Sequence, residues 1–174
     1  ISSRSLAKRR RAEHFRPMSE SRAAPPHKQA EKAALIASLP PGRGLWVFTY
    51  GSLMWNPEFA FVGRVPARVH GYHRAFCVFS HTYRGTPERP GLVLGLDRGG
   101  SCMGFAYRIA AAARVEAIQA LWQREMDNGV YDARLLKVRS RGKLHSALAF
   151  TVDRLHAHYA GGLSIERTAS LVRQ

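Results

Sequence analysis

The sequence predicts an α+β fold in which several short strands form a small barrel or a curled sheet with one central helix. From residue 46 onward, short segments rich in β-branched and aromatic residues recur between turn sequences that contain Gly or Pro. One longer segment, 111–126, has the hydrophobic spacing of a helix. The 174 residues, 45% of them hydrophobic, are enough for one domain with a buried core.

The first 44 residues differ in composition from the rest of the chain. Residues 1–23 are polar and charged, which is typical of a tail. Residues 27–39 contain good helix formers and predict a short helix. The sequence Pro-Pro-Gly-Arg-Gly at 40–44 then ends this helix and predicts a linker. We therefore divide the chain into a basic N-terminal tail with a short helix and a linker, 1–44, and a folded domain, 45–174.

The folded domain is expected to contain strands and helices in a definite order. Strands are predicted at 46–50, 68–81, 92–97, 102–109, 131–140 and 145–153. The Gly and Pro content of 82–91 predicts a loop. Hairpin-like turns are expected at 98–100 and at 141–142. A second helix is predicted at 162–174, with Ser164 near its N-cap.

The formal net charge of +15 is unevenly distributed. Residues 1–45 carry ten Lys and Arg against three Asp and Glu, and residues 46–174 carry seventeen against nine. After residue 45 the positive charges are scattered, and no stripe interleaved with aromatic residues appears. This pattern favours a small anionic ligand over a nucleic-acid partner.

Two features exclude other classes of protein. No run of 18 apolar residues is present, so no membrane span is predicted. Cys77 and Cys102 form no CxxC motif and have no metal-ligand spacing, and His70 and His73 add no recognisable set of ligands. We therefore expect reduced, buried thiols in a cytoplasmic protein, and no metal site.

The helix predicted at 111–126 carries a carboxylate on its apolar face. Val115, Ile118 and Trp122 mark this face. Glu125 follows Trp122 by three residues and Ile118 by seven, so it lies on the same face, whereas Glu116 points the opposite way at roughly 100° per residue. Burial raises the pKa of a carboxyl group toward neutrality, where a general acid/base works best. Glu125 is therefore a candidate acid/base.

A structural role for Glu125 is the alternative. A glutamate at a helix end can pair with an arginine at the edge of the core, and either Arg124 or Arg84 could supply that partner. Position in the helix alone does not separate the two roles.

The sequence Tyr50-Gly51-Ser52-Leu53 follows the first predicted strand. A strand that ends in such a turn can present successive backbone N–H groups to a carboxylate or an oxyanion, and glycine permits a close approach. A plain turn is the alternative. The GxSxG pattern of a serine hydrolase is absent, so Ser52 is not predicted to be a nucleophile.

Taken together, four separated motifs resemble those of the ChaC-type γ-glutamylcyclotransferases, which act on glutathione. The motifs are WVFTYGSLMWNP (46–57), GYHRAFC (71–77), YRGTPERPGLVLGL (83–96) and LWQREMDNGVY (121–131), with GFAYRI (104–109) as a weaker fifth. They occur in the family's order and at similar spacing over about residues 46–160. The ordered set is more specific than any single motif.

The resemblance implies a γ-glutamylcyclotransferase-like fold, a small β-barrel with flanking helices, and a catalytic domain at 45–174. It implies that the turn at 50–53 is the substrate loop and that Glu125 is the catalytic acid/base. Tyr131 would be a hydrogen-bonding partner, and Arg84 would face the anionic substrate. The implied reaction converts glutathione to 5-oxoproline and cysteinyl-glycine by attack of the substrate's own amine, without a cofactor.

Some features depart from the family, and other functions stay open. Thr49 stands where a glycine often precedes the tyrosine, and we expect the chain to lack a further C-terminal helical region of the family. The alternatives are a cyclotransferase for other γ-glutamyl amines and a non-catalytic ligand-binding or regulatory module on the same fold. A nucleic-acid-binding protein ranks third. The oligomeric state is left open.

Overall fold

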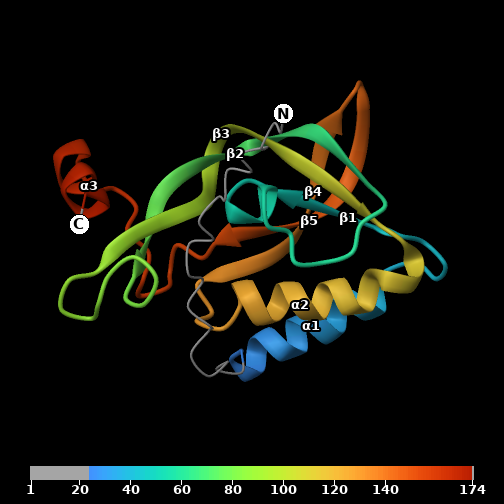
Figure 1. The fold of residues 1–174 in the computed structure, drawn as a ribbon, viewed down its shortest axis with the longest axis horizontal. Coiled ribbons are helices and arrows are strands. Elements are labelled where there is room, and N and C mark those ends of the chain that lie inside the picture. The colour runs from blue at the N-terminus through green and yellow to red at the C-terminus, as the bar shows by residue number, and fades with distance from the viewer. Residues whose placement is uncertain (1–23, 174) are drawn as a thin grey trace, which may run out of the picture.

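Five strands form a closed barrel in the computed structural model, which describes residues 24–173 (Figure 1). The tail predicted at 1–23 lies outside the described residues. The strands are β1 Leu45–Thr49, β2 Gly63–Ser80, β3 Gly91–Ile109, β4 Tyr131–Ser140 and β5 Lys143–Val152. Their order around the barrel is β1-β3-β2-β4-β5. The barrel closes where β1 and β5 pair in parallel, with Trp46 opposite Ala147; the other neighbouring strands are antiparallel.

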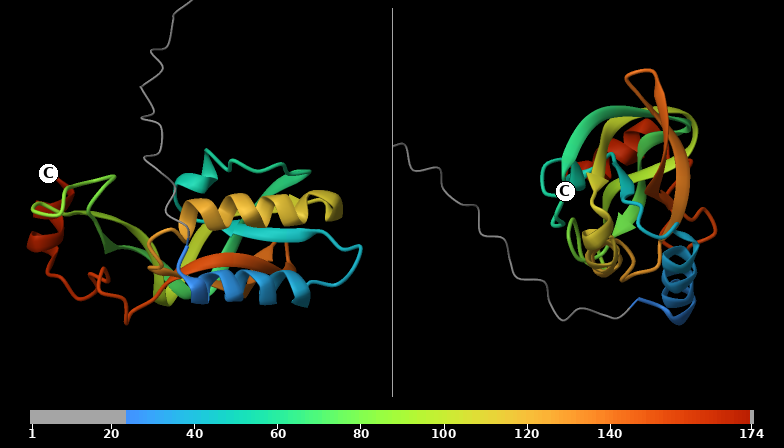
Figure 2. Two further views of the ribbon diagram at one scale, coloured as in Figure 1. Left: turned by 90° about the horizontal axis from the view of Figure 1, so that it is seen from below. Right: turned by 90° about the vertical axis from the view of Figure 1, so that its right-hand side faces the viewer.

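The prediction of a hairpin turn at 98–100 is wrong, because β3 continues through these residues as one strand. Gly99 and Gly100 have φ values of 106° and 65°, and Gly71 on the facing strand β2 has a φ of 83°. Pairing between β2 and β3 resumes on both sides with a shift in register. Because glycine tolerates positive φ, these residues bend the ribbon without reversing the chain. The far half of the β2–β3 ribbon extends away from the barrel as an arm (Figure 2).

Among the described residues, two α-helices flank the barrel and a third lies away from it. Helices α1 Pro26–Ser38 and α2 Arg114–Glu125 lie side by side against it, whereas α3 Ile165–Val172 lies at the far end of the arm (Figures 1 and 2). The helix predicted at 27–39 and the N-cap predicted at Ser164 are both confirmed; the Ser164 hydroxyl accepts a hydrogen bond from the backbone N–H of Arg167 at 3.2 Å.

Helix α2 packs into the core along one side. Ile118, Leu121 and Trp122 are at most 1% exposed. Val115, which the sequence placed on the same face, is instead 41% exposed, because the buried residues Ala117, Ile118, Leu121 and Trp122 centre the inner face about 90° away from it. Glu125 continues this inner face one turn beyond Leu121.

Helix α1 is attached to α2 and β4 by polar contacts. The Trp122 indole N–H donates a hydrogen bond to the Lys28 backbone carbonyl at 2.8 Å. The buried Lys28 ammonium donates to Asp132 Oδ1 at 2.9 Å, and the backbone N–H of Ala133 donates to Glu31 Oε1 at 3.0 Å. These contacts fix the start of β4 relative to the end of α2.

Two expectations about the class of protein can be compared with the described residues. Cys77 and Cys102 are both buried and form no disulfide, as the sequence predicted. Between residues 24 and 173, no helix combines the length and the apolar character that crossing a bilayer requires.

Candidate active site

Three chain segments place side chains at one end of α2. Tyr50 follows β1, Glu125 is the last residue of α2, and Tyr131 is the first residue of β4. Tyr50 is 9% exposed and Tyr131 is 8% exposed, and the Glu125 side chain is 18% exposed. The charge of Glu125 influences the pKa of both tyrosines, which places the three groups close together. The structure thus brings together residues that the sequence separates by up to 81 positions.

Glu125 can exist in both protonation states near neutral pH. Burial raises the pKa of its carboxyl group from 4.5 to about 7. The Arg124 guanidinium, whose Nε lies 3.3 Å from Glu125 Oε1, opposes this rise in pKa, whereas the nearby carboxylates of Asp127 and Glu58 add to it. The inward position that the helical spacing predicted for Glu125 is confirmed. The alternative was a structural pairing with an arginine. Arg124 does pair with Glu125 and lowers its pKa, but desolvation raises the pKa by more.

The two tyrosines are neutral hydrogen-bond donors. Burial raises the pKa of both phenols above the ordinary value, and the neighbouring Glu125 carboxylate adds to the rise. The Tyr131 hydroxyl donates a hydrogen bond to the backbone carbonyl of Leu94 at 3.0 Å. Tyr50 and Tyr131 therefore stay protonated over the range in which Glu125 titrates.

The turn after Tyr50 is a single 3₁₀ turn, Ser52–Met54, introduced by Gly51. Leu53 is 7% exposed and anchors the turn in the core. The backbone N–H of Met54 donates to the Gly51 carbonyl at 2.9 Å, whereas the N–H groups of Ser52 and Leu53 have no acceptor among the described residues. A Cβ atom placed on Gly51 would meet nothing within 4 Å, so this side of the turn is open. The turn can present two N–H groups to an anionic group.

Arg84 is not brought to this cluster. It is an exposed residue of the loop that connects β2 and β3, and its backbone N–H donates to Ser80 Oγ at 3.1 Å. Its neighbour Tyr83 lies closer to Glu125: desolvation together with the charges of Asp127 and Glu125 raises the pKa of the Tyr83 phenol, although this side chain is 70% exposed. The role of Arg84 toward the substrate stays a prediction.

Sequence reasoning missed two residues near Glu125. Tyr83 opens the third motif, YRGTPERPGLVLGL, and an aromatic residue at the start of a Gly- and Pro-rich loop was the available signal. Arg124 was considered only as a structural partner. In the structure it bonds to Ser52, Asn56 and Glu58 as well as to Glu125.

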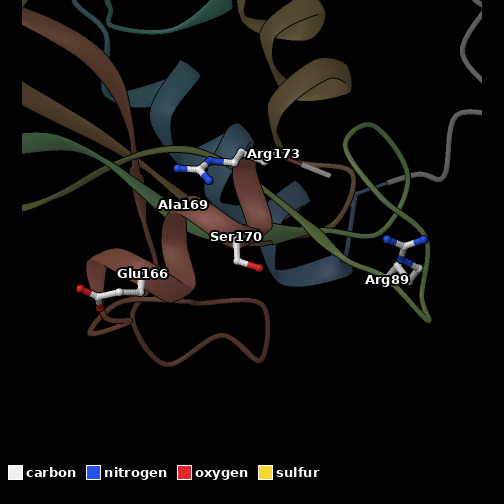
Figure 3. A pocket seen from close by; sticks show the side chains of 5 residues that line it. All are labelled: Arg89, Glu166, Ala169, Ser170 and Arg173. Carbon is white, nitrogen blue, oxygen red and sulfur yellow. The ribbon is translucent and has the colours of Figure 1, made fainter.

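Two surface hollows lie outside the cluster. One, of about 660 Å³, lies between the β2–β3 loop and α3 and is lined by Arg89, Glu166, Ala169, Ser170 and Arg173 (Figure 3). Glu166 and Arg173 extend from opposite ends of α3, and Arg89 comes from the separate loop, so the polar groups do not converge. The other hollow, of about 200 Å³, adjoins Glu58 and the exposed side of α2. Neither contains Glu125 or Tyr50.

The described residues include no group of three or more His, Cys, Asp and Glu side chains arranged to hold a metal ion. Among the residues of the cluster, Glu125 can transfer protons near neutral pH, and the tyrosine hydroxyls and the turn can form hydrogen bonds.

A protein family and two relatives of known activity resemble this chain. The ChaC-like protein family matches residues 45–174. The glutathione-specific gamma-glutamylcyclotransferase of Escherichia coli (strain K12) is 34% identical over 146 residues, which cover 83% of this chain and 63% of that protein. Glutathione-specific gamma-glutamylcyclotransferase 1 of Mus musculus is 38% identical over 94 residues, which cover 53% of this chain and 42% of that protein. The chain thus spans less than two thirds of the length of either relative.

Solved structures share the architecture. A gamma glutamyl cyclotransferase specific to glutathione from yeast superposes with a TM-score of 0.68 at 21% identity, covering 74% of this chain and 77% of that one. YkqA from Bacillus subtilis superposes with a TM-score of 0.56 at 22% identity, covering 82% of this chain and 57% of that one. The expected small barrel with flanking helices is confirmed. Because the family match runs from residue 45 to residue 174, the chain belongs to the ChaC-like protein family.

Proposed function

We propose that this protein is a γ-glutamylcyclotransferase that cleaves glutathione to 5-oxoproline and cysteinyl-glycine. The observation that carries the proposal is the buried Glu125 carboxyl group, whose pKa of about 7 suits it to accept and return a proton near neutral pH. Membership of the ChaC-like family and the activity for which the relatives are named support the choice of reaction.

The reaction needs no nucleophile from the protein. The α-amine of a γ-glutamyl group reaches its own γ-carbonyl and closes a five-membered lactam, so the attack is intramolecular. The ammonium group must first lose a proton to become nucleophilic, and the attacking nitrogen loses a second proton as the lactam forms. The departing cysteinyl nitrogen must gain a proton. We assign the proton transfers to Glu125, which acts as base and then as acid.

The remaining groups of the cluster suit the charges on the substrate. The N–H groups of Ser52 and Leu53 can donate hydrogen bonds either to the developing oxyanion or to the substrate's α-carboxylate. The Tyr50 hydroxyl remains protonated and can donate a hydrogen bond to the reacting carbonyl. The Tyr131 hydroxyl donates its proton to the Leu94 carbonyl, so its oxygen can accept a hydrogen bond from the substrate's amine. None of these steps requires a metal or an organic cofactor.

We propose glutathione as the substrate because the relatives in E. coli and mouse are named as specific for it. The two buried, unbridged cysteines accord with a cytoplasmic location, where glutathione keeps thiols reduced. A preference for other γ-glutamyl amines is the alternative within the same chemistry. Turnover of γ-glutamyl-lysine in place of glutathione would support that alternative.

Incubation with glutathione, followed by mass-spectrometric detection of 5-oxoproline and cysteinyl-glycine, tests the proposal. Replacing Glu125 by Gln should lower kcat by ~10²–10⁴-fold, the usual contribution of a general acid/base. Glu166→Gln makes the same chemical change at an exposed position on α3 and should leave kcat unchanged. Normal turnover by a folded Glu125→Gln variant would remove Glu125 from the mechanism. Calorimetric binding of glutathione without 5-oxoproline release would instead indicate a non-catalytic binding module.

A further inference from the structure

Arg124 connects the end of α2 to the turn that follows β1. Its Nη2 donates a hydrogen bond to Ser52 Oγ at 2.9 Å, and its Nη1 donates to the backbone carbonyl of Asn56 at 2.9 Å. Nη1 also lies 2.9 Å from Glu58 Oε1. On the other side, Nε lies 3.3 Å from Glu125 Oε1. One guanidinium thus contacts three positions of the segment 51–58 and the candidate acid.

The geometry depends on the shape of the guanidinium. Its five N–H donors lie in one plane and point in fixed directions, so one side chain can hold several acceptors in a defined arrangement. With only 19% of the Arg124 side chain exposed, its ion pairs are less screened by solvent than those of a surface arginine. A lysine could supply the charge but not the same set of directed hydrogen bonds.

We propose that Arg124 is a positioning residue that ties the segment 51–58 to the end of α2 and thereby fixes the backbone amides of the turn relative to the Glu125 carboxyl group. This inference rests on the proposed function, because the spacing matters only if both groups act on one substrate. Arg124 acts through Ser52 and Glu125 rather than on the substrate itself.

Glu58 is the second carboxylate, besides Glu125, that pairs with Arg124. The Asn56 side-chain amide donates to Glu58 Oε1 at 2.8 Å, and the same oxygen contacts Arg124. Arg124 therefore shares its positive charge between the carboxylates of Glu58 and Glu125. Arg124 lowers the pKa of Glu125, and the like charge of Glu58 raises it. Removing Arg124 should therefore raise the pKa of Glu125, and removing Glu58 should lower it.

The other groups that face Glu125 are unchanged by these substitutions. The titratable groups that interact with it are Arg124 of α2, Asp127 of the following loop, Glu58, Tyr50, Tyr131 of β4 and Tyr83 of the arm. The tyrosines are neutral near pH 7, because burial is the largest cause that raises the pKa of each. Asp127 is present in every variant, so its contribution to the pKa of Glu125 does not differ between them.

The test uses the full chain with ¹³C-labelled glutamate, in which Glu125→Gln identifies the Glu125 carboxyl signal. In Arg124→Gln, the NMR-measured pKa of Glu125 should rise by at least ~1 unit, as expected when an opposite charge within hydrogen-bonding distance is lost. In Glu58→Gln, the pKa should fall. Amide hydrogen exchange across 51–58 should accelerate by at least ~10-fold in Arg124→Gln because the tie is broken.

Two further variants separate positioning from charge. Arg124→Lys keeps the charge, so it should restore most of the pKa of Glu125 but not the slow exchange of the turn. Arg167→Gln replaces an exposed arginine of α3 and should change neither measurement. If Arg124→Gln fails to fold, Arg124→Lys and Glu58→Gln still give both readouts. An unchanged Glu125 pKa in folded Arg124→Gln, or unchanged exchange at 51–58 in folded Arg124→Gln or Arg124→Lys, would overturn the proposal.

Activity measurements keep this inference distinct from the proposed function. With glutathione, Arg124→Gln should lower kcat by ~10–100-fold and move the pH dependence of kcat upward with the pKa of Glu125. If the wild-type protein releases no 5-oxoproline while the pKa and exchange change as expected, the cyclotransferase assignment fails and the tie is supported. If the wild type is active and Arg124→Gln keeps its kcat and its pH profile, the positioning role fails alone.

Discussion

Replacing Lys28 by Met tests how strongly α1 is attached to the domain. The Lys28 side chain is 5% exposed, and its ammonium lies 2.9 Å from Asp132 Oδ1 and 3.4 Å from Glu31 Oε2. Methionine has a similar apolar stem and removes only the charge. The hydrogen bond from Trp122 to the Lys28 backbone carbonyl does not involve the side chain and should survive the substitution.

The expected loss in the free energy of unfolding follows from these contacts. A hydrogen bond to a charged group contributes ~1.5–3 kcal/mol. Asp132 is not stranded by the change, because its side chain is 27% exposed and Arg134 Nη2 remains 3.0 Å from its other oxygen. We therefore expect a loss of about 2 kcal/mol for Lys28→Met. Lys28→Ala also removes three methylenes at ~0.8 kcal/mol each and should lose about 4 kcal/mol.

Urea unfolding, followed by tryptophan fluorescence and circular dichroism, measures both losses. Lys32→Met is the matched control, because Lys32 lies one turn further along α1 and has no carboxylate within 4 Å among residues 24–173. It should change the free energy of unfolding by less than ~0.5 kcal/mol. A Lys28→Met variant as stable as the control would show that the buried ion pair contributes no net stability and would refute this reasoning.

Two further predictions concern Glu125 and Gly95. Because the pKa of Glu125 is about 7 when folded and near 4.5 when unfolded, the folded state binds the proton more tightly, and the wild type loses up to ~3 kcal/mol as the pH rises through this window. Glu125→Gln cannot ionise, so thermal melts should show it more stable than the wild type at pH 8 but not at pH 4. A Cβ on Gly95 would lie 2.6 Å from Cys77 Sγ, so Gly95→Ala should destabilise by ~1–3 kcal/mol, and the change should be smaller in a Cys77→Ala background in urea unfolding.

Clear outcomes would contradict these two predictions. If the stability difference between wild type and Glu125→Gln is the same at pH 4 and pH 8, the carboxyl group does not carry a raised pKa. Glu116→Gln serves as the pH control, since Glu116 is an exposed glutamate on the same helix. If the effects of Gly95→Ala and Cys77→Ala simply add, the close approach of β2 and β3 at this point is not a steric limit.

Hydrophobic periodicity predicted the direction of side chains better than the depth of their burial. The spacing from Ile118 to Glu125 correctly placed Glu125 on the inner side of α2, because the helical repeat fixes the angle around the helix axis. The same rule placed Val115 inward, yet it is 41% exposed. Ala117, in the same first turn, is 3% exposed, so Val115 lies at the edge of a buried face that is centred nearer to Leu121. Spacing among three apolar residues does not fix where the centre of the buried face lies.

Turn residues were also ambiguous without the partner strand. Arg98-Gly99-Gly100 has the composition of a hairpin turn, but Gly71 on β2 adopts positive φ beside it and the two strands bend together. Whether two glycines reverse a chain or form a bulge depends on pairing with a strand that precedes them by almost thirty residues. The residues next to these glycines do not show which strand they will pair with.

The candidate site was predictable where local sequence decides it and not where long-range contacts do. The turn at 50–53 and the acid at the end of α2 could each be recognised from a few adjacent residues. The contacts of Arg124 with Ser52, Asn56 and Glu58 could not, because Ser52 and Arg124 are 72 positions apart and only the closure of the barrel brings them together. For the same reason Arg84 and Arg124 were equivalent as partners of Glu125 in the sequence.

The position of α1 bears on how the protein maintains a buried acid. Keeping Glu125 in a site that raises its pKa destabilises the ionised folded state, so the elements that carry the acid must be held by other contacts. Helix α1 holds two of them at once: its Lys28 accepts a hydrogen bond from Trp122, one turn before Glu125, and pairs with Asp132, the residue after Tyr131. The boundary proposed at residue 44 from composition therefore runs between segments that pack together, and we expect cleavage of the 40–44 linker to weaken the site as well as the fold.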